Sequence, residues 1–125
     1  MTINEVSKRF GLSHETLRYY ERIGLIPMIT RNKSGIRDYS EKDCNWIESV
    51  KCMRSSGLPI EMLIEYRTLY EKGNQTIDAR KDLLIEQHKL LISKMEDMKS
   101  TIARLENKIE RYKNGLMVID EDNFL

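Results

Sequence analysis

Residues 18–22 read Arg-Tyr-Tyr-Glu-Arg, so two cationic side chains stand beside aromatic rings in a short segment. If the segment is helical, Leu17 belongs to its apolar face. Arg18, Tyr19 and Arg22 then share another face, where packing calls for no arginine. Arginine can read guanine with two hydrogen bonds, and tyrosine can donate to phosphate. The cluster therefore predicts a DNA contact, and an ordinary amphipathic helix with aromatic packing is the alternative.

A basic hairpin is expected directly after this helix. Residues 32–35 read Asn-Lys-Ser-Gly, a turn sequence, and a short strand is expected on each side of it. Arg31, Lys33 and Arg37 surround the turn. Alone, such charges can simply keep a loop soluble. Beside a DNA-reading helix they favour a wing that touches phosphate or the minor groove.

Cys52 is a side chain whose placement suggests covalent chemistry. On the expected third helix, Cys52 falls nearly opposite the apolar face that contains Cys44 and Ile47. A thiol in that position is expected to be accessible to solvent or to meet a partner chain. Reactivity requires the thiolate, which nearby Lys51 favours weakly and Glu48 disfavours. A sensing thiol and a plain surface or interface thiol both fit these residues.

Other kinds of site are not indicated. His14 and His88 are too isolated to ligate a metal, and the two cysteines do not have zinc-ligand spacing. On one helix, Cys44 and Cys52 would lie roughly 12 Å apart, too far for a disulfide. The sequence contains no Gly-rich phosphate loop, nucleophile elbow or paired-carboxylate motif. We therefore expect no metal, no cofactor and no enzymatic activity.

Local signals place the basic cluster on the second of two short helices. Thr2 and Glu5 form a capping-box pattern that starts the first helix, and Gly11 ends it. Ser13 caps the second helix, which Gly24 closes. Two helices joined by such a tight turn have helix-turn-helix proportions.

Two more helices are expected after the hairpin. Ser40 with Asp43 starts a third helix that ends near Gly57. Pro59 suits the first turn of a fourth helix, which runs to about Tyr70. These helices complete a small N-terminal domain.

From residue 76 onward the pattern changes to a heptad repeat. Apolar residues recur at the a and d positions of a helix of about 35 to 39 residues, expected within residues 76–115 and roughly 55 Å long at 1.5 Å per residue. The expected seam residues are Leu84, Leu91, Met95, Met98, Ile102, Leu105, Ile109 and Tyr112. One helix cannot bury this seam alone, so a second copy of the chain is the simplest partner, and packing inside one chain is the alternative. The seam residues do not decide between a parallel and an antiparallel pair.

Charge is distributed unevenly along the 125 residues. Residues 1–58 contain 10 Lys/Arg and 7 Asp/Glu, a net charge of +3, whereas residues 59–125 contain 11 and 13, a net charge of −2. The positive charge therefore accompanies the basic cluster and the hairpin. No apolar run is long enough to span a membrane and no signal-peptide core is present, so a cytoplasmic location is expected.

Three stretches resemble the MerR family of bacterial transcription regulators. They are residues 2–7 (Thr-Ile-Asn-Glu-Val-Ser), residues 16–27 (Thr-Leu-Arg-Tyr-Tyr-Glu-Arg-Ile-Gly-Leu-Ile-Pro) and residues 31–39 (Arg-x-x-x-Gly-x-Arg-x-Tyr). The resemblance covers essentially the whole chain. The DNA-contacting residues that it implies are Thr16, Arg18, Tyr19, Arg22, Arg37 and Tyr39, with Arg31, Asn32 and Lys33 as weaker candidates.

The expected fold is mainly α-helical. A winged helix-turn-helix domain with linking helices occupies residues 1–72, a dimerisation helix occupies residues 76–115, and an acidic tail occupies residues 116–125. The resemblance implies a homodimer joined by an antiparallel coiled coil and bound to inverted repeats in promoter DNA. It also implies that an effector makes the dimer bend and untwist an overlong promoter spacer, so that RNA polymerase can use the promoter.

The resemblance also limits the class of effector to which the protein is expected to respond. Metal-sensing and redox-sensing members carry cysteines around or after the dimer helix, whereas residues 115–125 contain no Cys and no His. The chain is also too short for the appended ligand domain of multidrug-sensing members. The remaining short subgroup responds to aldehydes, other electrophiles or oxidative stress through a lone cysteine in the third-helix region, a position that Cys52 resembles.

Two other functions remain open. The chain could be a DNA-binding repressor that needs no effector. It could also be a coiled-coil interaction module whose N-terminal domain docks protein, although a basic face with Arg18, Arg22 and Arg37 argues against this reading.

Overall fold

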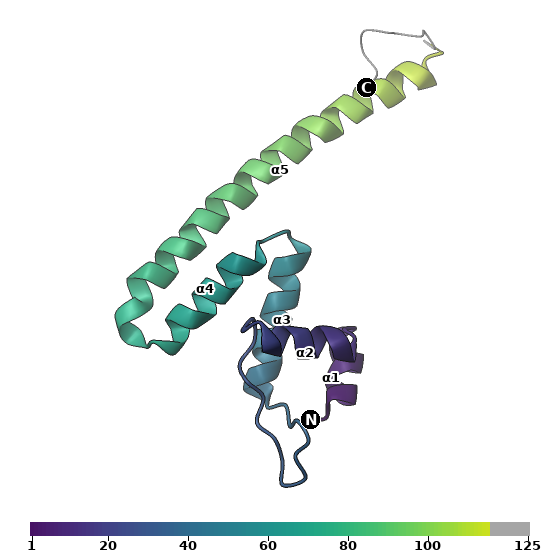
Figure 1. Cartoon of the computed structure of the whole chain (residues 1–125). Helices are drawn as coiled ribbons and strands as arrows, with labels where there is room; N and C mark the ends of the chain where they lie inside the picture. The colour runs from purple at the N-terminus through teal and green to yellow at the C-terminus, as the bar shows by residue number, and fades with distance from the viewer. Residues whose placement is uncertain (116–125) are drawn as a thin grey trace. The chain divides into compact units, whose positions relative to one another are not determined.

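The computed structural model describes residues 1–115, and the predicted acidic tail over residues 116–125 lies outside the described residues. Figure 1 shows the order of the helices along the chain. They are α1 (Ile3–Phe10), α2 (His14–Arg22), α3 (Glu41–Ser55), α4 (Ile60–Glu71), the short 3₁₀ helix η1 (Asn74–Thr76) and α5 (Ile77–Lys113). The chain divides into two units between Leu83 and Leu84. The mainly helical fold expected from the sequence is confirmed.

Helices α1 and α2 begin where the capping signals predicted. The N–H of Glu5 donates to Thr2 Oγ1 at 3.1 Å, and the N–H of Thr2 donates to the Glu5 carboxylate at 3.0 Å, which completes a capping box. Gly11 ends α1 with a φ of 65°, a left-handed conformation that favours glycine. Ser13 Oγ then accepts the N–H of Thr16 at 3.0 Å and starts α2. The two helices form the predicted helix-turn-helix.

Local signals also mark the starts of helices α3 and α4. Ser40 and Asp43 form a second capping box at the start of α3. Between the two helices, Arg54 Nη1 donates to the carbonyl oxygen of Leu58 at 2.7 Å. Pro59 is the N-cap of α4, one position earlier than the first-turn site expected for it. The boundaries of both helices are therefore set mainly by local signals.

The core of the first unit is shared by α1 to α4 and the segment between α2 and α3. Within that segment, residues 28–39 are here called the wing. The buried apolar side chains of the core are Val6, Phe10, Leu17, Leu25, Ile26, Ile29, Tyr39, Cys44, Ile47, Val50, Leu58, Met62 and Leu63. Helices of this length are marginal in isolation. Burial of apolar area, worth about 25 cal/mol per Å², is what holds them together.

The wing differs from the predicted pair of strands. Within residues 1–115, the only β pairing is a single antiparallel bridge between Arg31 and Arg37. Asn32 Oδ1 accepts the N–H groups of Ser34 and Ile36, at 2.9 and 3.0 Å. The backbone adds N–H bonds from Asn32 to the Ile36 carbonyl oxygen and from Asp38 to the Thr30 carbonyl oxygen, both at 2.8 Å. The wing is therefore a tight hairpin-like loop with one bridge, and the two regular strands expected on either side of the turn do not form.

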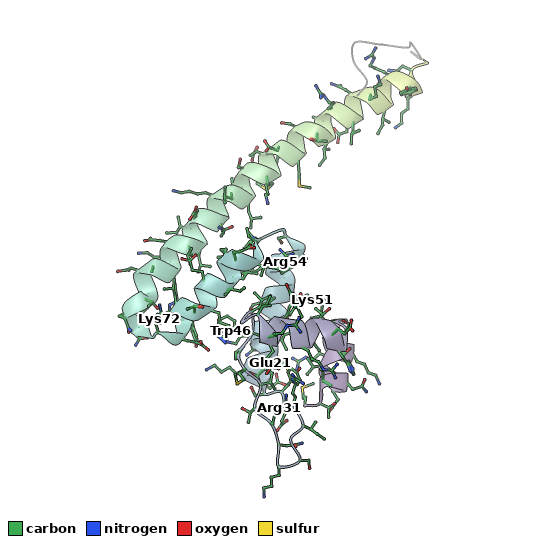
Figure 2. All side chains as sticks on the ribbon, viewed as in Figure 1. Glu21, Arg31, Trp46, Lys51, Arg54 and Lys72 are labelled. Atoms are coloured by element: carbon green, nitrogen blue, oxygen red, sulfur yellow. The ribbon has the colours of Figure 1, made fainter. Side chains whose placement is uncertain are left out.

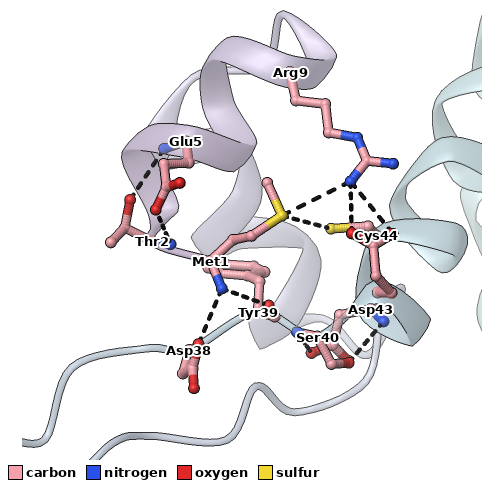
Figure 3. Close-up of polar contacts among 10 residues, drawn as sticks. Met1, Thr2, Glu5, Arg9, Asp38, Tyr39, Ser40, Asp43 and Cys44 are labelled. Carbon is pink, nitrogen blue, oxygen red and sulfur yellow. Dashed lines mark hydrogen bonds and ion pairs between the residues drawn. The ribbon is translucent and has the colours of Figure 1, made fainter.

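The end of the wing is tied to the start of the chain (Figure 3). The Met1 amino group donates to the carbonyl oxygen of Tyr39 at 2.8 Å and to Asp38 Oδ1 at 3.0 Å. The N–H of Tyr39 donates back to the Met1 carbonyl oxygen at 2.8 Å. Nearby, Arg9 pairs with Glu41 at 3.1 Å and links α1 to α3. These contacts hold the last residues of the wing against the helical core.

Helix α5 has 37 residues, a length that agrees with the heptad prediction. None of its residues is buried. Among the predicted seam residues Leu91 is half-buried, and the other seven are exposed. In residues 1–115, no helix combines the length and hydropathy that a membrane span needs. The seam is therefore an apolar surface in a single described chain.

Ile47, which is fully buried on α3, tests the assigned core. Ile47→Ala should lower the free energy of unfolding by about 2–5 kcal/mol, because it removes buried methyl groups and leaves a cavity. Met28→Ala is the matched control, since Met28 is 84% exposed. This control should change the free energy of unfolding by no more than about 0.5 kcal/mol. Urea denaturation followed by circular dichroism measures both, and equal effects would contradict the assigned core.

Candidate nucleic-acid interface

Helix α2 presents one polar, cationic face to solvent. The residues that line an open hollow on this face are Glu15, Thr16, Arg18, Tyr19 and Arg22. Leu17 is fully buried and sets the rotation of the helix, so the opposite face points outward. The guanidinium carbon of Arg22 lies 5.3 Å from the centre of the Tyr19 ring, a cation–π contact. Four of the residues predicted to contact DNA therefore lie together on one exposed surface.

The tip of the wing carries three further candidates, Arg31, Asn32 and Lys33, all of which are exposed. Arg31 Nη1 donates to the carbonyl oxygen of Gly35 at 2.8 Å, so its guanidinium lies against the turn. Asn32 Oδ1 already accepts two backbone N–H groups of the turn. Asn32 thus shapes the tip, while Arg31 and Lys33 supply its positive charge.

Arg37 lies deeper than the tip and has a carboxylate partner. Its side chain is 23% exposed, and its Nε donates to Glu21 Oε1 at 2.7 Å. Glu21 belongs to α2, and its other carboxylate oxygen accepts the N–H of Ile29 at 3.2 Å. Sequence reasoning did not single out Glu21. The signal available in the sequence was that Glu21 is the only acidic residue in the segment from Arg18 to Arg22.

Tyr39 is placed differently from the expected DNA contact. Its side chain is only 2% exposed. Its hydroxyl has no hydrogen-bond partner within residues 1–115, and burial raises the pKa of the phenol. The spacing after Arg37 showed where Tyr39 falls in the chain but not that its ring turns into the core. The structure therefore does not offer Tyr39 as a surface contact.

The two cysteines of α3 lie where the helical pattern predicted. Cys52 is exposed and Cys44 is buried. Burial raises the pKa of the Cys44 thiol and so disfavours its thiolate. Lys51, labelled in Figure 2, is the neighbour of Cys52 and donates to the carbonyl oxygen of Phe10 at the end of α1. The exposed thiol thus sits on a helix that is bonded directly to the helix-turn-helix.

Metal ligation finds no support in the part of the chain that the structure describes. Residues 1–115 contain no group of three or more His, Cys, Asp or Glu side chains that could hold a metal ion. His14 and His88 belong to different helices, α2 and α5. The chemistry that the surface offers is instead that of guanidinium, ammonium and phenol donors, which suit phosphates and base edges.

The sequence of this chain is similar to those of known proteins. Residues 1–68 match the family model described as MerR HTH family regulatory protein. The chain is 56% identical over 92 residues to the HTH-type transcriptional regulator AdhR of Bacillus subtilis. That match covers 74% of this chain and 66% of the relative, slightly under two thirds of its length.

Solved structures share the fold. A putative MerR family transcriptional regulator from Listeria monocytogenes has a TM-score of 0.89 and 43% identity, covering 94% of this chain and 89% of that one. HiNmlR, a MerR family regulator lacking the sensor domain and crystallised with promoter DNA, has a TM-score of 0.84 and 26% identity, covering 94% and 93%. The class of protein that the fold and the surface define is a DNA-binding transcription regulator. The chain belongs to the MerR family, as the sequence motifs predicted.

Arg18 and Arg37 should affect DNA binding in different ways. Arg18→Ala should weaken binding to a palindromic site from the DNA upstream of the gene by about 1–3 kcal/mol, because the predicted contact of Arg18 is with a base. Arg37→Ala should weaken binding to that site and to random DNA alike, because the predicted contact of Arg37 is with a phosphate. The salt slope, which is the slope of log affinity against log salt concentration, should become shallower by about one. Fluorescence anisotropy at several salt concentrations measures both effects.

Lys81→Ala, which removes an exposed cation of α5, is the matched control and should leave both affinities within about twofold of the wild type. If Arg18→Ala and Arg37→Ala behaved like this control, these two residues would not belong to the DNA-binding surface.

Proposed function

We propose that the chain binds a palindromic promoter site as a homodimer, with α2 in the major groove and the wing against flanking phosphates. The observation that carries this proposal is the outward face of α2, where Arg18, Tyr19 and Arg22 lie together. Arginine suits base edges and tyrosine suits phosphate. HiNmlR, which has a similar fold, was crystallised with promoter DNA and lends further support.

A homodimer would bring two such surfaces to one DNA molecule. The apolar seam of α5 supports this step, because its exposed side chains would leave water on pairing with a second copy. Each half of a palindrome would then receive one α2, and the spacing of the half-sites would follow the symmetry of the protein. The resemblance to the family favours an antiparallel pair.

The regulatory action that we propose is activation. The dimer would bend and untwist an overlong spacer, so that RNA polymerase could use both promoter elements. Bending a site of this size costs of order 1–6 kcal/mol, which phosphate contacts from two protomers could offset. Double-stranded promoter DNA, a second copy of the chain and RNA polymerase are the proposed partners.

Cys52 is the proposed point at which a stress signal acts. Modification by an aldehyde or another electrophile requires access to the thiol, which Cys52 has and Cys44 lacks. Lys51 ties α3 to the end of α1. A group added at Cys52 would therefore act on the helix that helps to hold the helix-turn-helix in place.

Ile102→Lys tests the proposed dimer. It should convert dimers to monomers, since burying an unpaired charge in the seam is unfavourable. Leu90→Lys is the matched control, because Leu90 and Ile102 are 50% and 51% exposed in the single chain but only Ile102 lies on the seam. Sedimentation velocity should give a monomer mass for Ile102→Lys and a dimer mass for Leu90→Lys. A dimer mass for both would place the interface elsewhere.

Cys52→Ser tests the proposed sensing and activation together. In a promoter–reporter assay, the electrophilic aldehyde acrolein should raise transcription with the wild type and with Cys44→Ala, but not with Cys52→Ser. Cys52→Ser should still bind promoter DNA, because only the nucleophilic thiol is lost. Mass spectrometry of the treated wild type should find the adduct on Cys52.

Three other outcomes would point elsewhere. Normal induction of Cys52→Ser would leave Cys52 as a plain surface thiol. Repression that acrolein does not relieve would favour a repressor without an effector. Absence of DNA binding by the wild type would favour a protein-interaction module.

A further inference from the structure

Glu21 connects the DNA-reading helix to both sides of the wing. It lies in α2, near the base of the wing and close to Arg31 (Figure 2). One carboxylate oxygen accepts Arg37 Nε at 2.7 Å, and the other accepts the N–H of Ile29 at 3.2 Å. Ile29 enters the wing and Arg37 leaves it, so a single side chain binds the two arms of the loop to α2. The Glu21 side chain is only 13% exposed, which strengthens both bonds relative to exposed ones.

Within residues 1–115, the only hydrogen bonds recorded between α2 and the wing are the two that Glu21 accepts. The two arms of the wing share one β bridge, and the N–H groups of Asp38 and Asn32 donate to the carbonyl oxygens of Thr30 and Ile36. The tip residues 30–36 are all exposed. Burial of Ile29 and Tyr39 anchors the two ends of the wing, and the Met1 amino group bonds to Asp38 and Tyr39 at its last residues. The carboxylate of Glu21 is therefore the hydrogen-bonded link between the wing and α2.

The bond to Glu21 also orients Arg37. It engages Nε, and the structure records no hydrogen bond from the two terminal nitrogens to any atom of residues 1–115. A guanidinium held by one edge presents its remaining donors in a fixed direction. Such an arginine loses less conformational entropy when it binds a phosphate.

We propose that Glu21 is a positioning residue for DNA binding, which sets the wing against α2 and aims Arg37 at phosphate. This inference rests on the proposed DNA-binding function. Positioning and charge repulsion predict opposite effects of removing the Glu21 carboxylate on DNA affinity. If only charge mattered, removing a carboxylate beside a DNA-binding surface should tighten binding, because the carboxylate repels phosphate. If Glu21 positions Arg37 and the wing, removing the carboxylate should weaken binding.

The test is a double-substitution cycle on a palindromic site from the upstream DNA. Glu21→Gln should weaken binding by about tenfold. In an Arg37→Ala background, the same change should alter binding by less than about twofold, because a Gln amide oxygen still accepts the Ile29 N–H and only the pair with Arg37 is lost. Glu71→Gln is the matched control, since Glu71 also pairs with an arginine, Arg67, but within α4 and outside α2 and the wing. This control should stay within about twofold of the wild type.

Arg37→Lys provides a second variant that does not depend on the folding of Glu21→Gln. Lysine keeps the charge but lacks Nε, so binding should weaken while the salt slope stays close to that of the wild type. Thermal unfolding of each variant identifies any loss of the folded state.

Each alternative outcome is distinct. Equal or tighter binding by Glu21→Gln would overturn the positioning role and leave the proposed function intact. An equal loss with and without Arg37 would show that Glu21 does not act through Arg37, which also overturns the inference. Failure of the wild type to prefer the palindrome would instead overturn the proposed function.

Discussion

Helix α2 has nine residues, too few to be stable alone, and it is held against α1 with Leu17 fully buried. Because successive helical residues are rotated by about 100°, one buried side chain decides which others face outward. Arg18 and Arg22 are exposed for this reason. The cationic surface is therefore a consequence of packing. Without the apolar core beneath Leu17, α2 would not be stable and the same residues would not be held on one face.

Two ion pairs of the first unit illustrate different uses of charge. Arg9 and Glu41 are 41% and 72% exposed, so their pair is weakened by solvent and adds little to stability. Glu21 and Arg37 are 13% and 23% exposed, and desolvation offsets much of their attraction. The N–H of Ile29 helps to compensate the Glu21 carboxylate. The value of this pair lies in geometry, since it relates the wing to α2.

Helix α5 has little packing within the single described chain. A helix of 37 residues with none buried gains little stability from packing within the described chain. Its apolar residues follow a heptad spacing, which is the geometry of helix pairing. Dimerisation and DNA recognition are thus linked in the proposed function, because only a pair of chains presents two copies of α2 to a palindrome.

The sequence by itself determined the helices and their limits. Capping pairs such as Thr2 with Glu5 and Ser40 with Asp43 act across three residues, and the heptad repeat of α5 is equally local. Even the contrast between Cys44 and Cys52 followed from helical periodicity.

Only the tertiary structure decided how the wing is built and which of its residues face inward. Tyr39 is buried in the core, and Arg37 pairs with Glu21, which lies 16 residues away in the chain. No local pattern encodes such contacts, because they depend on the distance between elements that come together only when the core forms.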